Sequence, residues 1–318
     1  ETTKGWVKAI DRANLQLKDG QVHGLIGESG SGKTLIAKTL VGVLDNRWKV
    51  TADRLHWNGK DLLNFPIEER RRLLTEDIAI IFQHSDDSLD PTATIGDQLS
   101  EAVPDKELAR RFFRKSGQRT ERVIELLHRV GIKHHDLCLS SYPGQLSDSI
   151  CQRIMIAIAL ARNPKLLIAD EPTGSLGASS QDQIIRLFMK LNKVHNMSLL
   201  LISHNIDLVT DLSDTMTVLY AGQTVECGPS AKVYKQPFHP YTKALIESNP
   251  HFNENLQPKS MLPTLEGTIP TVQHLPIGCR LGPRCPRAQK TCVVAPDAQK
   301  HQSRIVSCHY PLFKEVSS

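Results

Sequence analysis

A chain of 318 residues with 40% hydrophobic and 23% charged residues has the composition of an ordinary soluble globular protein. Its length is enough to bury one large core or two modest ones. The net charge of +5 is too small to indicate a nucleic-acid partner, and no apolar run approaches the ~18–20 residues of a membrane-spanning helix.

The N-terminus carries neither an initiator Met nor a recognisable signal peptide, and the chain opens just before the apolar run 6–10. We therefore expect a first strand to precede this sequence. The seven cysteines are an odd number, which in the absence of a secretion signal predicts reduced thiols in a cytosolic protein.

The N-terminal residues 5–27 are predicted to form strands, and the last strand leads into a glycine-rich loop. The loop consists of Gly27, Glu28, Ser29, Gly30, Ser31, Gly32, Lys33 and Thr34. It fits G-x-x-x-x-G-K-[ST], the phosphate-binding loop, and apolar residues follow it at helical spacing. The loop therefore precedes a helix N-terminus, whose N–H groups and dipole attract phosphate. We predict that Lys33 reaches the β- and γ-phosphates of a nucleotide and that Thr34 ligates Mg²⁺.

The next elements are shorter. Residues 50–60 are predicted to form a strand that ends in a turn, and Pro66 opens a short charged helix over 66–74. The apolar run 77–82 predicts a buried strand that ends at Gln83. From about residue 84 to 162 helical patterns dominate, which indicates a helical subdomain.

A strand pattern returns at 165–172, where four apolar residues are followed directly by two carboxylates, Asp170 and Glu171. Parallel α/β proteins place their chemistry at the carboxyl ends of such strands. In this Walker B pattern Asp170 would hold Mg²⁺, and Glu171 would orient and polarise the attacking water. The alternative is that the two carboxylates form a helix N-cap cluster.

A helix at about 179–195 and a strand at 198–202 follow, and the strand ends beside His204. A His at this edge can contact the γ-phosphate and fix the water and Glu171. Alternating strands and helices with polar residues at the strand ends predict a phosphate-loop, RecA-like α/β core.

These motifs stand in the order and spacing of the nucleotide-binding subunits of ABC transporters, which the chain resembles over about residues 5–235. The resemblance implies a cassette over 1–235 with its helical subdomain at about 84–162. It implies that Gln83 touches Mg²⁺ and links the site to a membrane subunit. Trp6 is the candidate for the aromatic residue that stacks on adenine.

The signature motif of this family, Leu-Ser-Gly-Gly-Gln, is altered here to Leu146-Ser147-Asp148-Ser149-Ile150. In ABC dimers this motif from one subunit caps the ATP held by the other. Asp148 would repel the γ-phosphate by roughly 1 kcal/mol or more. Because the following D-loop also departs from the family, with Gly177 after Leu176, we expect an asymmetric heterodimer. The alternative is that the backbone tolerates both changes.

The C-terminal section, 236–318, is rich in proline and carries four of the seven cysteines, Cys279, Cys285, Cys292 and Cys308. Its segments 238–242 and 278–286 resemble the extension of oligopeptide and dipeptide transporter ATPases. Four thiolates suit a [4Fe–4S] cluster or a tetrahedral zinc. The wide spacing and the resemblance favour the cluster, with zinc and free thiols as alternatives.

Residues 48–54, 125–133 and 275–286 further resemble Sap-type peptide transporter subunits. This implies an ATPase using ATP and Mg²⁺, peripheral on the cytoplasmic face of the inner membrane, that powers antimicrobial-peptide import. The implied partners are a second ATPase, two permeases and, indirectly, a periplasmic binding protein, with no nucleic acid. The alternatives are putrescine export, a regulatory ATPase of potassium uptake, and a soluble ABC ATPase, although the last class commonly carries two cassettes in one chain.

Overall fold

The computed structural model describes residues 5–82, 88–105, 115–174, 176–249 and 265–313. The predicted Mg²⁺ ligand Gln83 lies outside these ranges. The chain divides into two units, the first made of residues 1–39, 44–49 and 200–318, the second of residues 40–43 and 50–199. None of the described helices is both long enough and apolar enough to span a membrane.

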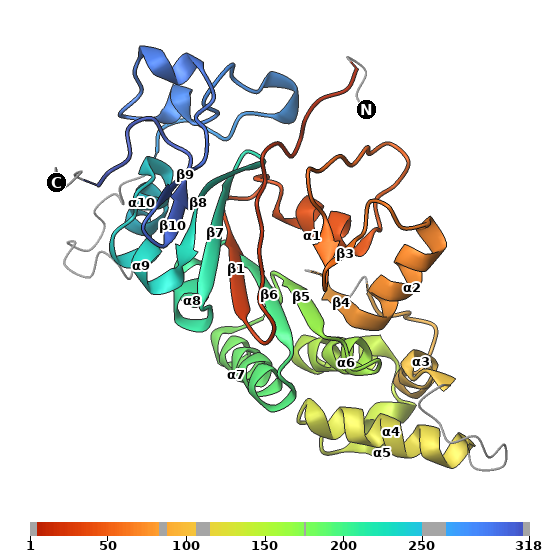
Figure 1. Cartoon of the computed structure of the whole chain (residues 1–318). Helices are drawn as coiled ribbons and strands as arrows, with labels where there is room; N and C mark the ends of the chain where they lie inside the picture. The colour runs from red at the N-terminus through yellow and green to blue at the C-terminus, as the bar shows by residue number, and fades with distance from the viewer. Residues whose placement is uncertain (1–4, 83–87, 106–114, 175, 250–264, 314–318) are drawn as a thin grey trace. The chain divides into compact units, whose positions relative to one another are not determined.

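The first unit is built on a sheet in which β1 (Val22–Ile26) pairs in parallel with β7 (Thr215–Tyr220). The sheet continues with antiparallel pairs through β8 (Gln223–Pro229), β10 (Arg304–Val306) and β9 (Gln299–His301) (Figure 1). All five residues of β1 are buried, His23 included, as in a strand that is covered on both faces.

The strands β9 and β10 come from the C-terminal extension, so this extension adds to the sheet beyond β8. A buried ion pair joins the two parts, because Arg304 in β10 lies 3.6 Å from the carboxylate of Glu226 in β8. The helices and 3₁₀ turns that begin in this unit are α1 (Lys33–Val41), α8 (Ile206–Leu212), α9 (Ser230–Lys235), α10 (Pro240–Glu247), Val272–His274, Gly282–Arg284 and Lys290–Val293.

The second unit pairs β4 (Ile78–Ile81) in parallel with β5 (Leu166–Asp170). Its other elements are β2 (His56–Trp57), β3 (Lys60–Asp61), α2 (Ile67–Asp77), α3 (Ile95–Ala102), α4 (Lys115–Arg129), α5 (His135–Ser140), a 3₁₀ turn (Pro143–Gln145), α6 (Asp148–Leu160) and α7 (Ala178–His195). The strand β6 (Ser198–Ser203) begins here and continues into the first unit. The helices α3 to α6 lie in the stretch predicted to be helical.

Three of the predicted elements differ in the structure. Residues 6–20 form no strand, because the amides of Asp11 and Asn14 make isolated hydrogen bonds to Gly222 and Thr224 rather than a ladder. The predicted strand at 50–60 is instead a hairpin of two-residue strands. The predicted helix 66–74 runs on to Asp77, whose carboxylate accepts a hydrogen bond from the Trp57 indole (2.8 Å) and pairs with Lys165 (3.0 Å).

Candidate nucleotide-binding site

The glycine-rich loop lies in the first unit, between the buried strand β1 and the helix α1, as predicted. Its glycines are required by space and by backbone conformation. A Cβ on Gly27 would lie 2.2 Å from the carbonyl oxygen of Leu219, and Gly32 has a φ of +103°. The main chain therefore packs against the sheet and turns in a way that a larger residue would prevent.

Lys33 lies along the inside of this loop, with a buried side chain. Its Nζ donates hydrogen bonds to the carbonyl oxygens of Gly27 (2.8 Å) and Glu28 (3.1 Å). The buried Ser31 hydroxyl finds no hydrogen-bond partner among the described residues. The Lys33 cation and the Ser31 hydroxyl, which can donate a hydrogen bond, are both suited to bind the phosphate oxygens of a nucleotide. The predicted Mg²⁺ ligand Thr34 follows directly and is exposed.

His204, also in the first unit, comes directly after β6 and is exposed. The turn that holds it is fixed on its C-terminal side by Asn205, the N-cap of α8. The Asn205 side chain accepts hydrogen bonds from the amides of Asp207 and Leu208, and its own amide donates to the Ser203 hydroxyl. The structure therefore places His204 at the end of a buried strand, as the sequence predicts.

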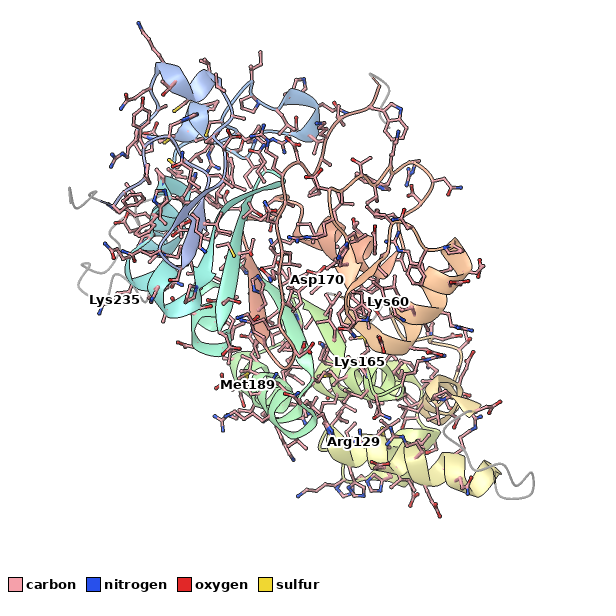
Figure 2. All side chains as sticks on the ribbon, viewed as in Figure 1. Lys60, Arg129, Lys165, Asp170, Met189 and Lys235 are labelled. Carbon is pink, nitrogen blue, oxygen red and sulfur yellow. The ribbon has the colours of Figure 1, made fainter. Side chains whose placement is uncertain are left out.

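The acidic strand end lies in the second unit. Every residue of β5 is buried, and the strand ends at Asp170, which Figure 2 labels. Asp170 is 1% exposed. Glu171 has a left-handed backbone with a φ of +46°, which is uncommon for a residue other than glycine. The alternative of an N-cap cluster does not hold, because the helix that follows, α7, has Gly177 as its N-cap.

The altered signature forms the start of α6. Ser147 is the N-cap residue, but its side chain makes no capping hydrogen bond, and its carbonyl oxygen accepts from the amides of Ile150 and Cys151. Asp148 is the first helical residue and is exposed, and Ser149 follows it in the first turn. A carboxylate in the first turn stabilises the helix dipole but opposes an anion approaching that end.

The prediction of a [4Fe–4S] cluster is wrong, and zinc has no support either. Cys279, Cys285, Cys292 and Cys308 line one small cavity, yet the described part of the chain holds no group of three or more His, Cys, Asp or Glu side chains placed to hold a metal ion. Burial raises the pKa of Cys279, Cys285 and Cys308, the last to about 11. No disulfide bond joins any of the seven cysteines, all of which lie within the described ranges.

Sequence reasoning missed two residues that contact the glycine-rich loop, Tyr241 and Arg284. The hydroxyl of Tyr241 accepts the backbone N–H of Glu28 (2.9 Å), and Arg284 pairs with the Glu28 carboxylate (3.5 Å) and with the Tyr220 hydroxyl (3.3 Å). Tyr241 and Arg284 come from the C-terminal extension. No local pattern in a single sequence predicts such distant pairs.

A glycine-rich loop between a buried strand and a helix, with its lysine inside, and an acidic strand end elsewhere in the chain, define a phosphate-loop nucleotide-binding protein. Two family models match the chain, "ABC transporter" over residues 10–174 and "Oligopeptide/dipeptide transporter, C-terminal region" over residues 225–292. The chain belongs to the ABC transporter family of ATP-binding proteins.

Curated relatives match over nearly the whole chain. The peptide transport system ATP-binding protein SapD of Salmonella typhimurium is 47% identical over 99% of this chain and 96% of its own. SapD of Haemophilus influenzae is 43% identical over 98% of this chain and 89% of its own. The dipeptide transport ATP-binding protein DppD of Escherichia coli is 41% identical over 96% of this chain and 91% of its own.

Solved structures agree with the fold. A dimeric ATP-binding cassette in a post-hydrolysis state, bound to ADP and Pi, has a TM-score of 0.59 at 25% identity and covers 70% of this chain and 90% of its own. A cbiO1 component of an ABC transporter complex from Clostridium perfringens has a TM-score of 0.60 at 25% identity, covering 71% and 84%. The predicted cassette fold and the predicted class, an ATP-hydrolysing transporter subunit, are confirmed.

Proposed function

We propose that this chain is the ATP-hydrolysing subunit of a Sap-type peptide transporter, with the cassette at about 1–235 and the extension at 236–318. The observation that supports this proposal most strongly is the 47% identity to SapD over 99% of the chain, including the extension. The potassium-uptake, putrescine-export and soluble-ATPase alternatives have no comparable support among these relatives.

Lys33 holds the β- and γ-phosphates of ATP, and the loop amides surround them. Thr34, Asp170 and Gln83 would hold Mg²⁺, which would supply positive charge to the phosphate oxygens. The buried Asp170 suits this task, because the attraction between a carboxylate and a cation is stronger away from water. Thr34 and Gln83 bring neutral oxygen ligands.

Glu171 orients and polarises the water that attacks the γ-phosphate, and His204 fixes that water and the γ-phosphate. The left-handed backbone of Glu171 supports this role, because sparsely populated conformations cluster at functional sites. Trp6, whose side chain is 60% exposed, is the candidate to stack on adenine.

The chain forms a heterodimer with a second ATPase at the cytoplasmic face of the inner membrane. This heterodimer binds two permeases, and a periplasmic binding protein takes part indirectly. This chain donates Ser147, Asp148 and Ser149 to its partner's ATP. Because Asp148 opposes an anion, the site built on this chain's Lys33 is the one that turns over, and the partner's site is weak or slow.

The experiment is co-expression of the chain with its permeases and second ATPase, followed by ATPase assays of the purified complex in lipid vesicles. Cationic antimicrobial peptides should stimulate ATP hydrolysis, and putrescine should not. A chain that never co-purifies with permeases, or a complex stimulated only by putrescine, would contradict the proposal.

A further inference from the structure

The extension contacts the phosphate loop through Arg284, which ends the 3₁₀ turn Gly282–Arg284. Its side chain is only 9% exposed and lies 3.5 Å from the carboxylate of Glu28, a loop residue. The same guanidinium donates to the Tyr220 hydroxyl (3.3 Å) and to the carbonyl oxygens of Glu266 (3.0 Å) and Leu265 (3.3 Å). With four acceptors around it, the guanidinium has one fixed position.

A second contact fixes the main chain of the same loop residue. The Tyr241 hydroxyl, on α10, accepts the Glu28 N–H at 2.9 Å. The Tyr241 ring packs on Tyr220 with 4.7 Å between centroids, and both rings are fully buried. Glu28 is therefore held at its amide by Tyr241 and at its carboxylate by Arg284, which follow it by 213 and 256 positions.

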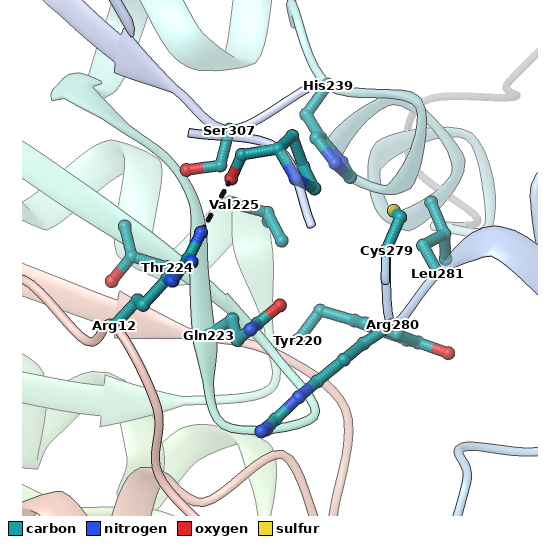
Figure 3. Close-up of a pocket in the computed structure, with 11 residues that line it drawn as sticks. Arg12, Tyr220, Gln223, Thr224, Val225, His239, Cys279, Arg280, Leu281 and Ser307 are labelled. Carbon is teal, nitrogen blue, oxygen red and sulfur yellow. Dashed lines mark hydrogen bonds between the residues drawn. The ribbon is translucent and has the colours of Figure 1, made fainter. Parts of the chain in front are cut away.

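The extension is also linked to the loop indirectly, through the turn between β7 and β8. The amide of Gly222 in that turn donates to the Ser31 carbonyl oxygen (2.7 Å). Arg280 donates to the carbonyl oxygen of Ala221, the preceding residue, and also to that of Lys8 (3.2 Å). Figure 3 shows Arg280 reaching from the extension to this turn.

Glu28 brings a negative charge into a loop that binds an anion. A bare carboxylate there would oppose the triphosphate as Asp148 opposes it at the signature. Arg284 lies close enough to compensate this charge. Its side chain is 9% exposed and that of Glu28 is 36% exposed, so solvent screens the pair only in part.

We propose that Arg284 is a positioning residue of the nucleotide site, and that through it the C-terminal extension sets the affinity of the phosphate loop for ATP. Arg284 neutralises Glu28 and, with Tyr241, holds the loop in its binding conformation. This assignment rests on the proposed use of the loop for ATP, and it adds a role for the extension.

The test measures binding of a fluorescent ATP analogue to the full chain by equilibrium titration. Arg284→Gln keeps an amide donor for the carbonyl partners but removes the charge, and should raise Kd about five- to tenfold. Arg284→Lys should restore most of the affinity. The matched control is Arg287→Gln, which removes the same charge from an exposed site of the extension and should change Kd by less than about twofold.

The decisive variant combines Arg284→Gln with Glu28→Gln. If Arg284 acts by neutralising Glu28, removing both charges should return Kd to within about twofold of the wild type. In the ATPase complex Arg284→Gln should raise KM with little change in kcat. Arg284→Gln binding like Arg287→Gln, or no recovery in the double variant, would overturn the inference. Absence of binding by the wild-type chain would instead overturn the proposed function.

Where Arg284→Gln does not fold, as judged by its thermal unfolding, the single variant Glu28→Gln carries the test. It leaves the Arg284 cation uncompensated beside the loop and should bind the analogue at least as tightly as the wild type. Weaker binding by more than about twofold would overturn the inference, since it would make the Glu28 charge itself favourable to nucleotide.

Discussion

Stability below neutral pH should depend on His23, which lies in β1 just before the phosphate loop. Its ring is 1% exposed, with Nδ1 at 2.7 Å from the Thr215 hydroxyl and Nε2 at 3.0 Å from the Thr217 hydroxyl. Burial lowers its pKa from 6.5 to about 4, because the charged imidazolium would lose its hydration.

The direction of the pH effect on the free energy of unfolding follows from the number of protons that each state binds. Between the unfolded pKa of 6.5 and the folded pKa of about 4, the unfolded chain binds a proton that the folded chain does not. The contribution of His23 is therefore present above pH 6.5 and is lost as the pH falls toward 4. Between about pH 7.5 and about pH 5.5 this loss amounts to about 1.4 kcal/mol of unfolding free energy.

The assay is urea unfolding of the wild type and of His23→Gln at both pH values, followed by circular dichroism. His23→Gln keeps an amide that can bond the two threonines but cannot titrate, so it should lose about 1.4 kcal/mol less than the wild type. Burial also lowers the pKa of His239, to about 3, so some pH dependence should remain in the variant. Equal losses in the two proteins would refute the reasoning.

Three further predictions follow from the site and the extension. Lys33→Ala should weaken binding of the ATP analogue in an equilibrium titration, because it removes the cation inside the loop. Arg304→Met should destabilise the chain by roughly 3–5 kcal/mol in thermal unfolding. It removes the guanidinium from the buried Glu226 carboxylate, which keeps only its hydrogen bonds from the amides of Phe238 and His239, and the added change Glu226→Gln should recover part of the loss. In the reconstituted complex, loss of the partner's catalytic Glu should remove little ATPase activity and loss of Glu171 most of it, whereas equal losses would mean that Asp148 is tolerated.

The sequence predicts the elements that carry the site because they are locally encoded. The strands at 22–26, 166–170 and 198–203 are unbroken buried runs, and α7 begins within one residue of its predicted start. The phosphate-binding loop can be recognised from its own glycines and lysine, without knowledge of distant residues. The conformation of residues 6–20 could not be predicted from their own sequence, because the hydrogen bonds of Asp11 and Asn14 are made to Gly222 and Thr224, more than 200 positions away.

The extension shows the limit of spacing along a chain. Four cysteines at suggestive intervals predict a metal, but intervals do not determine whether sulfur atoms converge with ligand geometry. The contact of Arg284 with Glu28 could not be predicted from the sequence either. The two residues are 256 positions apart, and no sequence motif contains both of them. Both features depend on tertiary packing.

The most direct test of the central claim, that this chain hydrolyses ATP to drive transport, is the steady-state ATPase rate of the reconstituted complex carrying Glu171→Gln, measured beside its ATP affinity. The residue acts on the water and not on nucleotide binding, so affinity should stay within about twofold while the rate falls by a factor of about 100 or more. A Glu171→Gln complex that hydrolyses ATP at the wild-type rate would contradict the account.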